Sequence, residues 1–155
     1  MTGRVSRNAA SSSPSSVISD AERAFIAAHR VGHLATADET GSPHVVPVCY
    51  AFDGRRIYTA IDRKPKRRPA RGLKRVLNVL ANPSVALAID DYSEDWAGLA
   101  YVLVQGSAEL LEDGDERAAA ESLLREKYPQ YRDLLDSGCP VIAITPRTTV
   151  SWGRV

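Results

Sequence analysis

Three strand-like segments near the beginning of the chain are separated only by short turns, which restricts the fold more than any other feature of the sequence. The pair Asp53-Gly54 is a strong signal for a two-residue hairpin. Strands joined in this way form an antiparallel meander. Pro47 cannot donate a ladder hydrogen bond, which indicates a sheet edge, a bulge or a place where a ligand takes the neighbouring backbone groups. The three predicted strands are 31–37, 44–52 and 56–61.

The remainder of the chain adds further strands with a few helices between them. Ser19 and Glu22 fit a capping box at the start of the first helix, and Asn82-Pro83 ends the second. Strands and helices do not alternate strictly, so the pattern argues against a doubly wound sheet. We predict a mainly β fold with peripheral helices, a small barrel of about six antiparallel strands and three helices. The later strands are 84–89, 99–111 and 141–152, and the outer helices are 20–30 and 114–127.

Length and composition are those of a single domain. The 155 residues carry a formal net charge of +1 and can bury about 70% of their unfolded surface. Residues 1–18 are polar and serine-rich, and we expect a disordered tail there, followed by one domain at 19–155. Cys49 and Cys139 have no metal-binding spacing and are expected to be buried thiols. Because the sequence contains neither a secretory signal nor an apolar run of membrane-spanning length, we expect a cytoplasmic protein.

A strongly basic segment follows the third strand and leads into the second helix. The helix has an apolar stripe predicted to face the core, made of Leu73, Val76, Leu77 and Leu80. A neighbouring face combines cations with an amide, and it consists of Arg71, Lys74, Arg75 and Asn78. Such a face suits a phosphate-bearing ligand. The alternatives are a solvated basic loop and a nucleic-acid surface, although no aromatic residues interleave with the cations as a nucleic-acid surface would favour.

Four segments of this sequence, taken in order, carry a resemblance to a known family. They are GHLATADETGSPHVVPVCYAFDGRRIYTAID (32–62), KRVLNVLANPSVALAID (74–90), VLVQGSAELLED (102–113) and VIAITPRTTVSWG (141–153). The set resembles the pyridoxamine 5'-phosphate oxidase-like flavoproteins, which have the FMN-binding split β-barrel fold. Within them it is most similar to the actinobacterial branch that uses the deazaflavin coenzyme F420. The resemblance implies a homodimer with two cofactor sites at the subunit interface.

The resemblance also implies how basic residues hold the cofactor. In the family, a basic residue three positions before an asparagine binds the cofactor phosphate, and Arg75 and Asn78 match these positions. The family residue is often lysine, so Lys74 is a candidate to share the role. We further interpret Lys64 and Lys66 as contacts for the acidic tail of F420, a phosphodiester extended by glutamates.

The ring system of the cofactor is expected between the second and third strands. The resemblance places the backbone of Thr59, Ala60 and Ile61 near the ring, with Pro47 and Val48 flanking it. Hydride transfer needs little from protein side chains, because the cofactor supplies the reactive atom. The sequence accordingly names no catalytic residue and no metal ligand.

We therefore predict an F420-dependent oxidoreductase that transfers a hydride between the reduced deazaflavin and a small unsaturated substrate. One alternative is an FMN-dependent oxidase or reductase of the pyridoxamine-phosphate-oxidase type. Another is a non-catalytic protein that binds a cofactor or haem. The expected partners are a second copy of the chain and a small-molecule substrate, without nucleic acid or membrane.

Overall fold

The computed structural model describes residues 6–9, 17–64 and 69–155, and within them it is dominated by one antiparallel sheet. Its strands are β1 (Ser6–Ala9), β2 (Val31–Ala37), β3 (Pro43–Cys49), β4 (Ala51–Phe52), β5 (Ile57–Ala60), β6 (Ser84–Asp91), β7 (Ala100–Leu111) and β8 (Val141–Gly153). The helices are α1 (Asp20–Ala28), α2 (Lys74–Ala81), α3 (Gly114–Lys127) and α4 (Tyr131–Leu134), with short 3₁₀ turns at Ala70–Gly72 and Trp96–Gly98.

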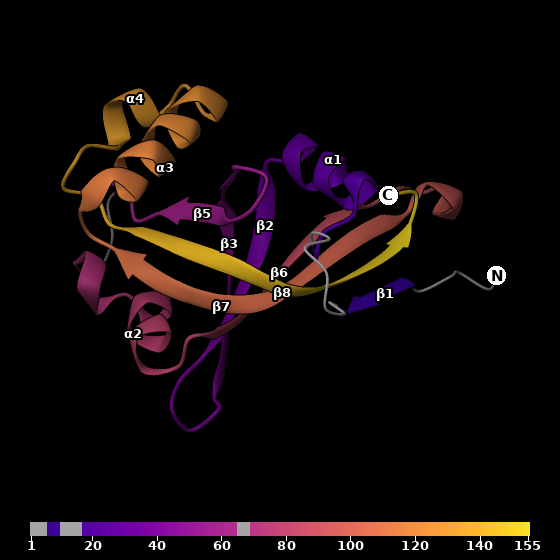
Figure 1. Cartoon of the computed structure of the whole chain (residues 1–155), viewed down its shortest axis with the longest axis horizontal. Helices are drawn as coiled ribbons and strands as arrows, with labels where there is room; N and C mark the ends of the chain where they lie inside the picture. The colour runs from indigo at the N-terminus through magenta and orange to yellow at the C-terminus, as the bar shows by residue number, and fades with distance from the viewer. Residues whose placement is uncertain (1–5, 10–16, 65–68) are drawn as a thin grey trace.

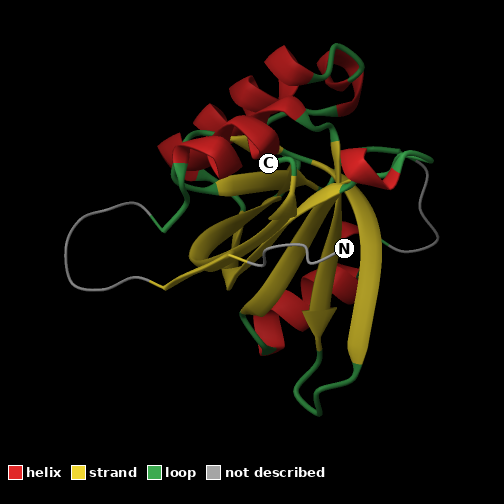
Figure 2. Ribbon diagram, turned by 90° about the vertical axis from the view of Figure 1, so that its right-hand side faces the viewer, coloured by secondary structure: helices red, strands yellow, loops and turns green. Residues whose placement is uncertain are grey.

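The sheet curls into an incomplete barrel with helices around it. Its strand order is β3-β2-β6-β7-β8-β5-β4, and β1 adds to β8. Figure 1 shows the long strands β7 and β8 crossing the molecule, with α3 and α4 at one end. In Figure 2 the strands curve between helices at the top and at the bottom of the view. The fold is thus mainly β with peripheral helices, as predicted, and it is the split barrel.

Alternate residues of the central strands face inward and form the main core. Leu34 of β2, Leu87 of β6 and Val104 of β7 are fully buried there, and Ile26 of α1 packs into the same cluster. A smaller cluster lies under α3, where Leu124 is fully buried against residues of β5 and β8. The strands β2, β6 and β7 therefore show the period of two that is expected when one face of a sheet is covered. All of β5 and the first four residues of β8 are buried, because the main core covers one of their faces and the cluster under α3 covers the other.

Helix α1 begins as the sequence predicts. The Ser19 hydroxyl accepts a hydrogen bond from the Glu22 backbone at 3.3 Å, and Glu22 Oε2 accepts one from the Ser19 backbone at 2.9 Å. This is the reciprocal capping box, which satisfies two backbone donors that the first helical turn leaves free. None of the helices in the described part of the chain has the length and apolar character needed to cross a bilayer.

The predicted strand 44–52 is divided at Tyr50, because a side chain from a distant segment replaces a strand neighbour there. The Tyr128 hydroxyl donates to the carbonyl of Tyr50 at 2.8 Å and accepts from its backbone N–H at 3.1 Å. Tyr50 is fully buried, and its own hydroxyl donates to the carbonyl of Ile26 at 2.6 Å. Through these hydrogen bonds Tyr50 connects the end of α3 to α1, and it lies at the break between β3 and β4.

A bulge between Gln105 and Gly106 bends the two longest strands, β7 and β8. A side chain at Gly106 is impossible without a shift of the backbone, since a Cβ atom there would lie 2.1 Å from the carbonyl oxygen of Thr145. The interruption that the sequence predicts near Pro146 lies directly opposite, where Pro146 pairs with Gly106. This bend helps the sheet to curl.

Two expectations from the sequence need correction. Residues 6–9, placed in a disordered tail, form β1, because pairing with β8 needs only backbone groups and no apolar side chains. Residues 1–5 and 10–16 of that tail lie outside the described residues. On α2, Leu77 and Leu80 were expected to face the core, but 44% and 55% of their surfaces are exposed. The buried positions of this helix are Val76, Asn78 and Val79.

Candidate functional site

A cavity of about 330 Å³ opens where the curled sheet does not close on itself. The strands β3 and β5 come near each other at this seam, and the described ladders do not pair them. Helix α2 and helix α4 each contribute one side chain to the cavity. The volume is at the lower end of the range for small-molecule sites. The lining residues are Val31, Pro47, Val48, Cys49, Thr59, Ala60, Asp62, Lys64, Arg75 and Tyr131.

One wall of the cavity is apolar and comes mainly from β3. Pro47 and Val48 lie there beside Val31 of β2. β3 is the end strand of the sheet in the described part of the chain, and such a strand tolerates a proline better than a central strand does. The sequence left three explanations for this proline, and the structure supports the edge strand. An apolar wall next to an open strand edge suits a flat aromatic ring.

The other end of the cavity is charged. Lys64 Nζ lies 3.3 Å from Asp62 Oδ2. Arg75 lies at the same end, and its Nε atom is buried without a hydrogen-bond partner among the described residues. Burial lowers the pKa of Arg75, while the nearby Asp62 carboxylate acts in the opposite direction. A guanidinium that has lost part of its hydration and keeps a free donor is well placed to bind an anion.

Tyr131 enters the cavity from α4 and connects the charged end to Cys49. Its ring is buried, with only 4% of its surface exposed, and Lys64 Nζ lies 5.7 Å from the ring centroid. Burial, together with the neighbouring Cys49 thiol and Asp62 carboxylate, raises the pKa of Tyr131. The hydroxyl therefore stays protonated at neutral pH and can serve as a hydrogen-bond donor.

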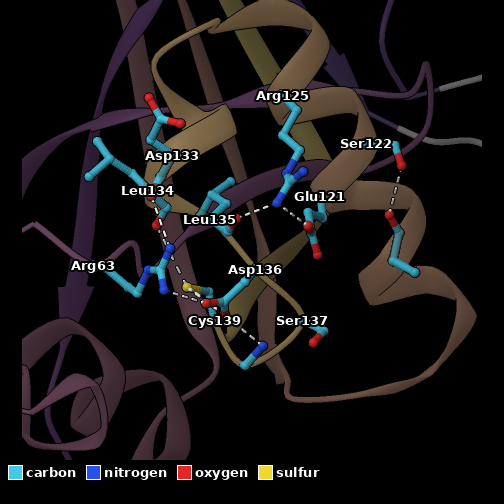
Figure 3. A network of polar contacts seen from close by, with 12 residues as sticks. Arg63, Glu121, Ser122, Arg125, Asp133, Leu134, Leu135, Asp136, Ser137 and Cys139 are labelled. Atoms are coloured by element: carbon cyan, nitrogen blue, oxygen red, sulfur yellow. Dashed lines mark hydrogen bonds and ion pairs between the residues drawn. The ribbon is translucent and has the colours of Figure 1, made fainter.

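Arg63 contacts α4 and the residues that follow α4, and it thereby connects them to the segment after β5 (Figure 3). Its side chain donates to the carbonyl of Asp133 at 2.9 Å and lies 2.8 Å from Asp136 Oδ2. Its backbone N–H donates to the carbonyl of Leu134 at 3.0 Å. Arg63 lies between Asp62 and Lys64 in the chain, so its contacts hold both neighbours close to α4, which carries Tyr131.

The structure brings together about half of the residues that the sequence assigned to a cofactor. Those that line the cavity are Pro47, Val48, Thr59, Ala60, Lys64 and Arg75. Ile61 does not line the cavity: its side chain is buried in the main core, and its backbone N–H donates to the carbonyl of Pro140 at 2.9 Å. Lys66 lies outside the described residues.

The other predicted residues lie away from the cavity. Arg71 is exposed and forms an ion pair with Glu112. Lys74 Nζ lies 3.0 Å from Asp38 Oδ2 on the surface. Asn78 is buried, its Nδ2 donates to the Thr36 hydroxyl at 3.0 Å, and its Oδ1 has no hydrogen-bond partner among the described residues. Their assignment to the cofactor stays a prediction that this geometry does not favour.

Sequence reasoning missed four residues of the cavity: Val31, Cys49, Asp62 and Tyr131. Cys49 and Asp62 directly follow the predicted site residues Val48 and Ile61 in the chain, and that adjacency was the available signal. Cys49 was expected to be a buried thiol, but it is only partly buried and reaches the cavity, whereas Cys139 is buried. Tyr131 comes from a distant segment, and nothing in the local sequence indicates its position.

Comparison with known proteins identifies the family of this chain. A family model described as pyridoxamine 5'-phosphate oxidase matches residues 18–152. The chain belongs to this family. A 5a,11a-dehydrotetracycline/5a,11a-dehydrooxytetracycline reductase from Streptomyces rimosus is 30% identical over 133 residues, which cover 85% of this chain and 80% of the reductase. The family resemblance stated from the sequence is thereby confirmed, and a reductase is among the relatives of this chain.

Solved structures share the fold at lower identity. A conserved hypothetical protein from Mycobacterium tuberculosis has a TM-score of 0.71 and 24% identity, covering 94% of this chain and 91% of that one. An F420 reductase has a TM-score of 0.61 and 21% identity, covering 85% and 98%. The haem storage protein HutZ from Vibrio cholerae has a TM-score of 0.65 and 15% identity, covering 80% and 86%. The fold therefore accommodates more than one kind of ligand.

Proposed function

We propose that this protein is an oxidoreductase that binds F420 and transfers a hydride between the reduced deazaflavin and a small unsaturated substrate. The observation that carries the proposal is a cavity with an apolar wall at one end and a partly buried guanidinium at the other. A coenzyme that joins a flat ring to a phosphate needs both surfaces in one site.

The residues present fit such a coenzyme. Arg75, with its unpartnered Nε, would hold the phosphate, and Lys64 would add a second cation. Pro47 and Val48 would lie against the ring, while the end of β5 at Thr59 and Ala60 offers backbone groups beside it. The bound coenzyme supplies the hydride chemistry. The chain's own task is to orient the ring, exclude water from one side of it and leave the other side open to substrate.

F420 is preferred over FMN because of the length of the basic segment. Of the eight cations between residues 63 and 75, Arg63, Arg71 and Lys74 pair with carboxylates outside the cavity. The other five, two of which line the cavity, still exceed the need of one phosphate, and the carboxylates of a glutamate tail would use the excess. The relationship to a reductase and the shared fold of an F420 reductase support this choice. An FMN-dependent enzyme of the same family is the alternative.

A second copy of the chain is proposed to complete the site. The cavity is shallow, and two large apolar side chains near it are exposed: Val31 by 49% and Val45 by 59%. Both lie on the same face of the β2–β3 hairpin, because Val31 pairs with Cys49 and Val45 with Ala35. Apolar surface next to a ligand site is typical of an interface. Light scattering during size-exclusion chromatography tests this, and a monomer across micromolar concentrations would reject it.

The function is tested by offering the purified protein F420, FMN and haem separately and following binding by fluorescence or absorbance. We expect F420 to bind at micromolar concentrations or below, and the bound reduced coenzyme to be oxidised by a substrate with an activated double bond. Absence of F420 binding would reject the proposal. Uptake of FMN alone would support the FMN alternative, and uptake of haem without turnover would support a storage role.

A further inference from the structure

Asp62 places a carboxylate at the charged end of the cavity, beside the cations that would receive a phosphate. Its side chain is 9% exposed, and its Oδ2 lies 3.3 Å from Lys64 Nζ. Its Oδ1 accepts the backbone N–H of Lys64 at 3.1 Å, which fixes the carboxylate in place. It also faces Arg75, whose guanidinium it stabilises in the charged form. Asp62 is thus a fixed anion that interacts with both cations of the cavity, Lys64 and Arg75.

A fixed carboxylate in this position acts on a ligand according to the ligand's charge. A phosphomonoester carries between one and two negative charges near pH 7, because its second pKa is about 6. A phosphodiester carries a single charge at any pH above about 2, since it lacks the second acidic group. Repulsion by Asp62 therefore falls more heavily on the monoester. Asp62 offsets part of the positive charge of Lys64 and Arg75, and it does so whether the ligand is a monoester or a diester.

We propose that Asp62 is a specificity-determining residue that selects cofactors joined through a phosphodiester over cofactors that end in a phosphomonoester. This inference rests on the proposed function and sharpens it, because F420 is a phosphodiester and FMN a monoester. Asp62 would not touch the reacting atoms. Its carboxylate lowers the net positive charge that the cavity presents to a ligand.

The expected size of the effect follows from Coulomb's law. An additional unit of ligand charge about 6 Å from Asp62, at an effective dielectric constant between those of water and a protein surface, changes affinity about tenfold. The effect should weaken as salt is added, because the cavity is open to solvent on one side. A purely structural role for Asp62, as acceptor of the Lys64 N–H, predicts equal changes for both ligand classes.

The test uses two probes that differ only at the phosphate: FMN and its phosphate monomethyl ester. Both are titrated into the full chain at pH 7.5 with flavin fluorescence as the readout. The variants are Asp62→Asn, which keeps the hydrogen-bond acceptor and removes the charge, and Asp62→Glu, which keeps the charge. Asp115→Asn serves as the matched control, since Asp115 is an exposed residue of α3 that does not line the cavity.

The extra charge of FMN is repelled by Asp62 and attracted by Lys64 and Arg75, so the informative quantity is the change in the affinity ratio of FMN to its methyl ester when Asp62 is replaced. Asp62→Asn should shift this ratio about tenfold in favour of FMN, while Asp62→Glu and Asp115→Asn should preserve it. An unchanged ratio in Asp62→Asn would overturn the inference alone. If the native protein binds F420 but neither flavin probe, the same comparison is made between intact F420, the phosphodiester, and the phosphomonoester that remains when its tail is cleaved off. Failure to bind any of these probes would overturn the proposed function together with the inference.

Discussion

Lys74 and Arg75 are consecutive cations of α2, yet they lie on different sides of the helix and in different surroundings. Lys74 is on the surface beside Asp38, with 46% of its side chain exposed. Arg75 is partly buried in the cavity, and its Nε has no hydrogen-bond partner among the described residues. The rotation of 100° per residue along a helix places Lys74 in a surface ion pair and Arg75 in the cavity.

The apolar residues of α2 show the same division. Val76 and Val79 are 1% and 4% exposed, whereas Leu77 and Leu80 on the other side are 44% and 55% exposed. Larger apolar side chains thus lie outside and smaller ones inside. The comparison shows that the sequence gives the period of a helix, while tertiary contacts decide which face is turned inward. Four predictions test it.

The largest expected effect is on cofactor affinity. Arg75→Ala should weaken F420 binding by about 10- to 100-fold, the range for losing a hydrogen bond to a charged group. Lys74→Ala, the matched control one residue away, should change affinity less than about twofold, because an exposed ion pair contributes little. Fluorescence titration of both variants measures the difference. Equal losses in the two variants would show that both faces of the helix meet the ligand.

The second prediction compares stability on the two faces. Val79→Ala should lower the free energy of unfolding by about 2 kcal/mol, because it removes buried methyl groups and leaves a cavity. Leu80→Ala should change it by less than about 0.5 kcal/mol, since the side chain is half exposed. Urea denaturation measures both. A large loss from Leu80→Ala would indicate that this leucine is covered in the native assembly.

The third prediction concerns Asn78, which the sequence assigned to the phosphate and the structure places against Thr36. Asn78→Ala should cost about 1 to 2 kcal/mol of unfolding free energy, because the buried hydroxyl of Thr36 loses its partner. F420 affinity should stay within about threefold when measured well below the unfolding transition. A selective loss of affinity without a loss of stability would return Asn78 to the binding site.

The smallest effect is on the titration of Asp38. The Thr40 hydroxyl, followed by Lys74, holds the pKa of Asp38 well below its ordinary range. A carboxyl with a lowered pKa contributes stability at neutral pH, and that contribution is lost as the pH falls below about 4. Lys74→Ala should raise this pKa in part, and Thr40→Val should raise it further. Carboxyl carbon NMR against pH checks the order, and a larger rise in Lys74→Ala would contradict it.

Local signals predicted much of the fold. The capping box at Ser19 and Glu22 forms as expected, and α3 matches the predicted helix at 114–127, because both depend on residues close in sequence. The hairpin order of the strands was likewise readable from turns and alternation. The division at Tyr50 was not, because its cause is a hydroxyl from Tyr128. Part of the candidate site shows the same limit, because Tyr131 reaches the cavity from a segment with no motif of its own.

The sequence by itself determined the family, the strand order along the chain and a concentration of cations after the third strand, since each is recorded in neighbouring residues. The tertiary structure alone decided which cation enters the cavity, which side of α2 is buried, and that Asp62 shares the charged end with Arg75 and Lys64. The reason is physical. Burial and charge pairing depend on distances between segments far apart in the chain, and no local pattern fixes those distances.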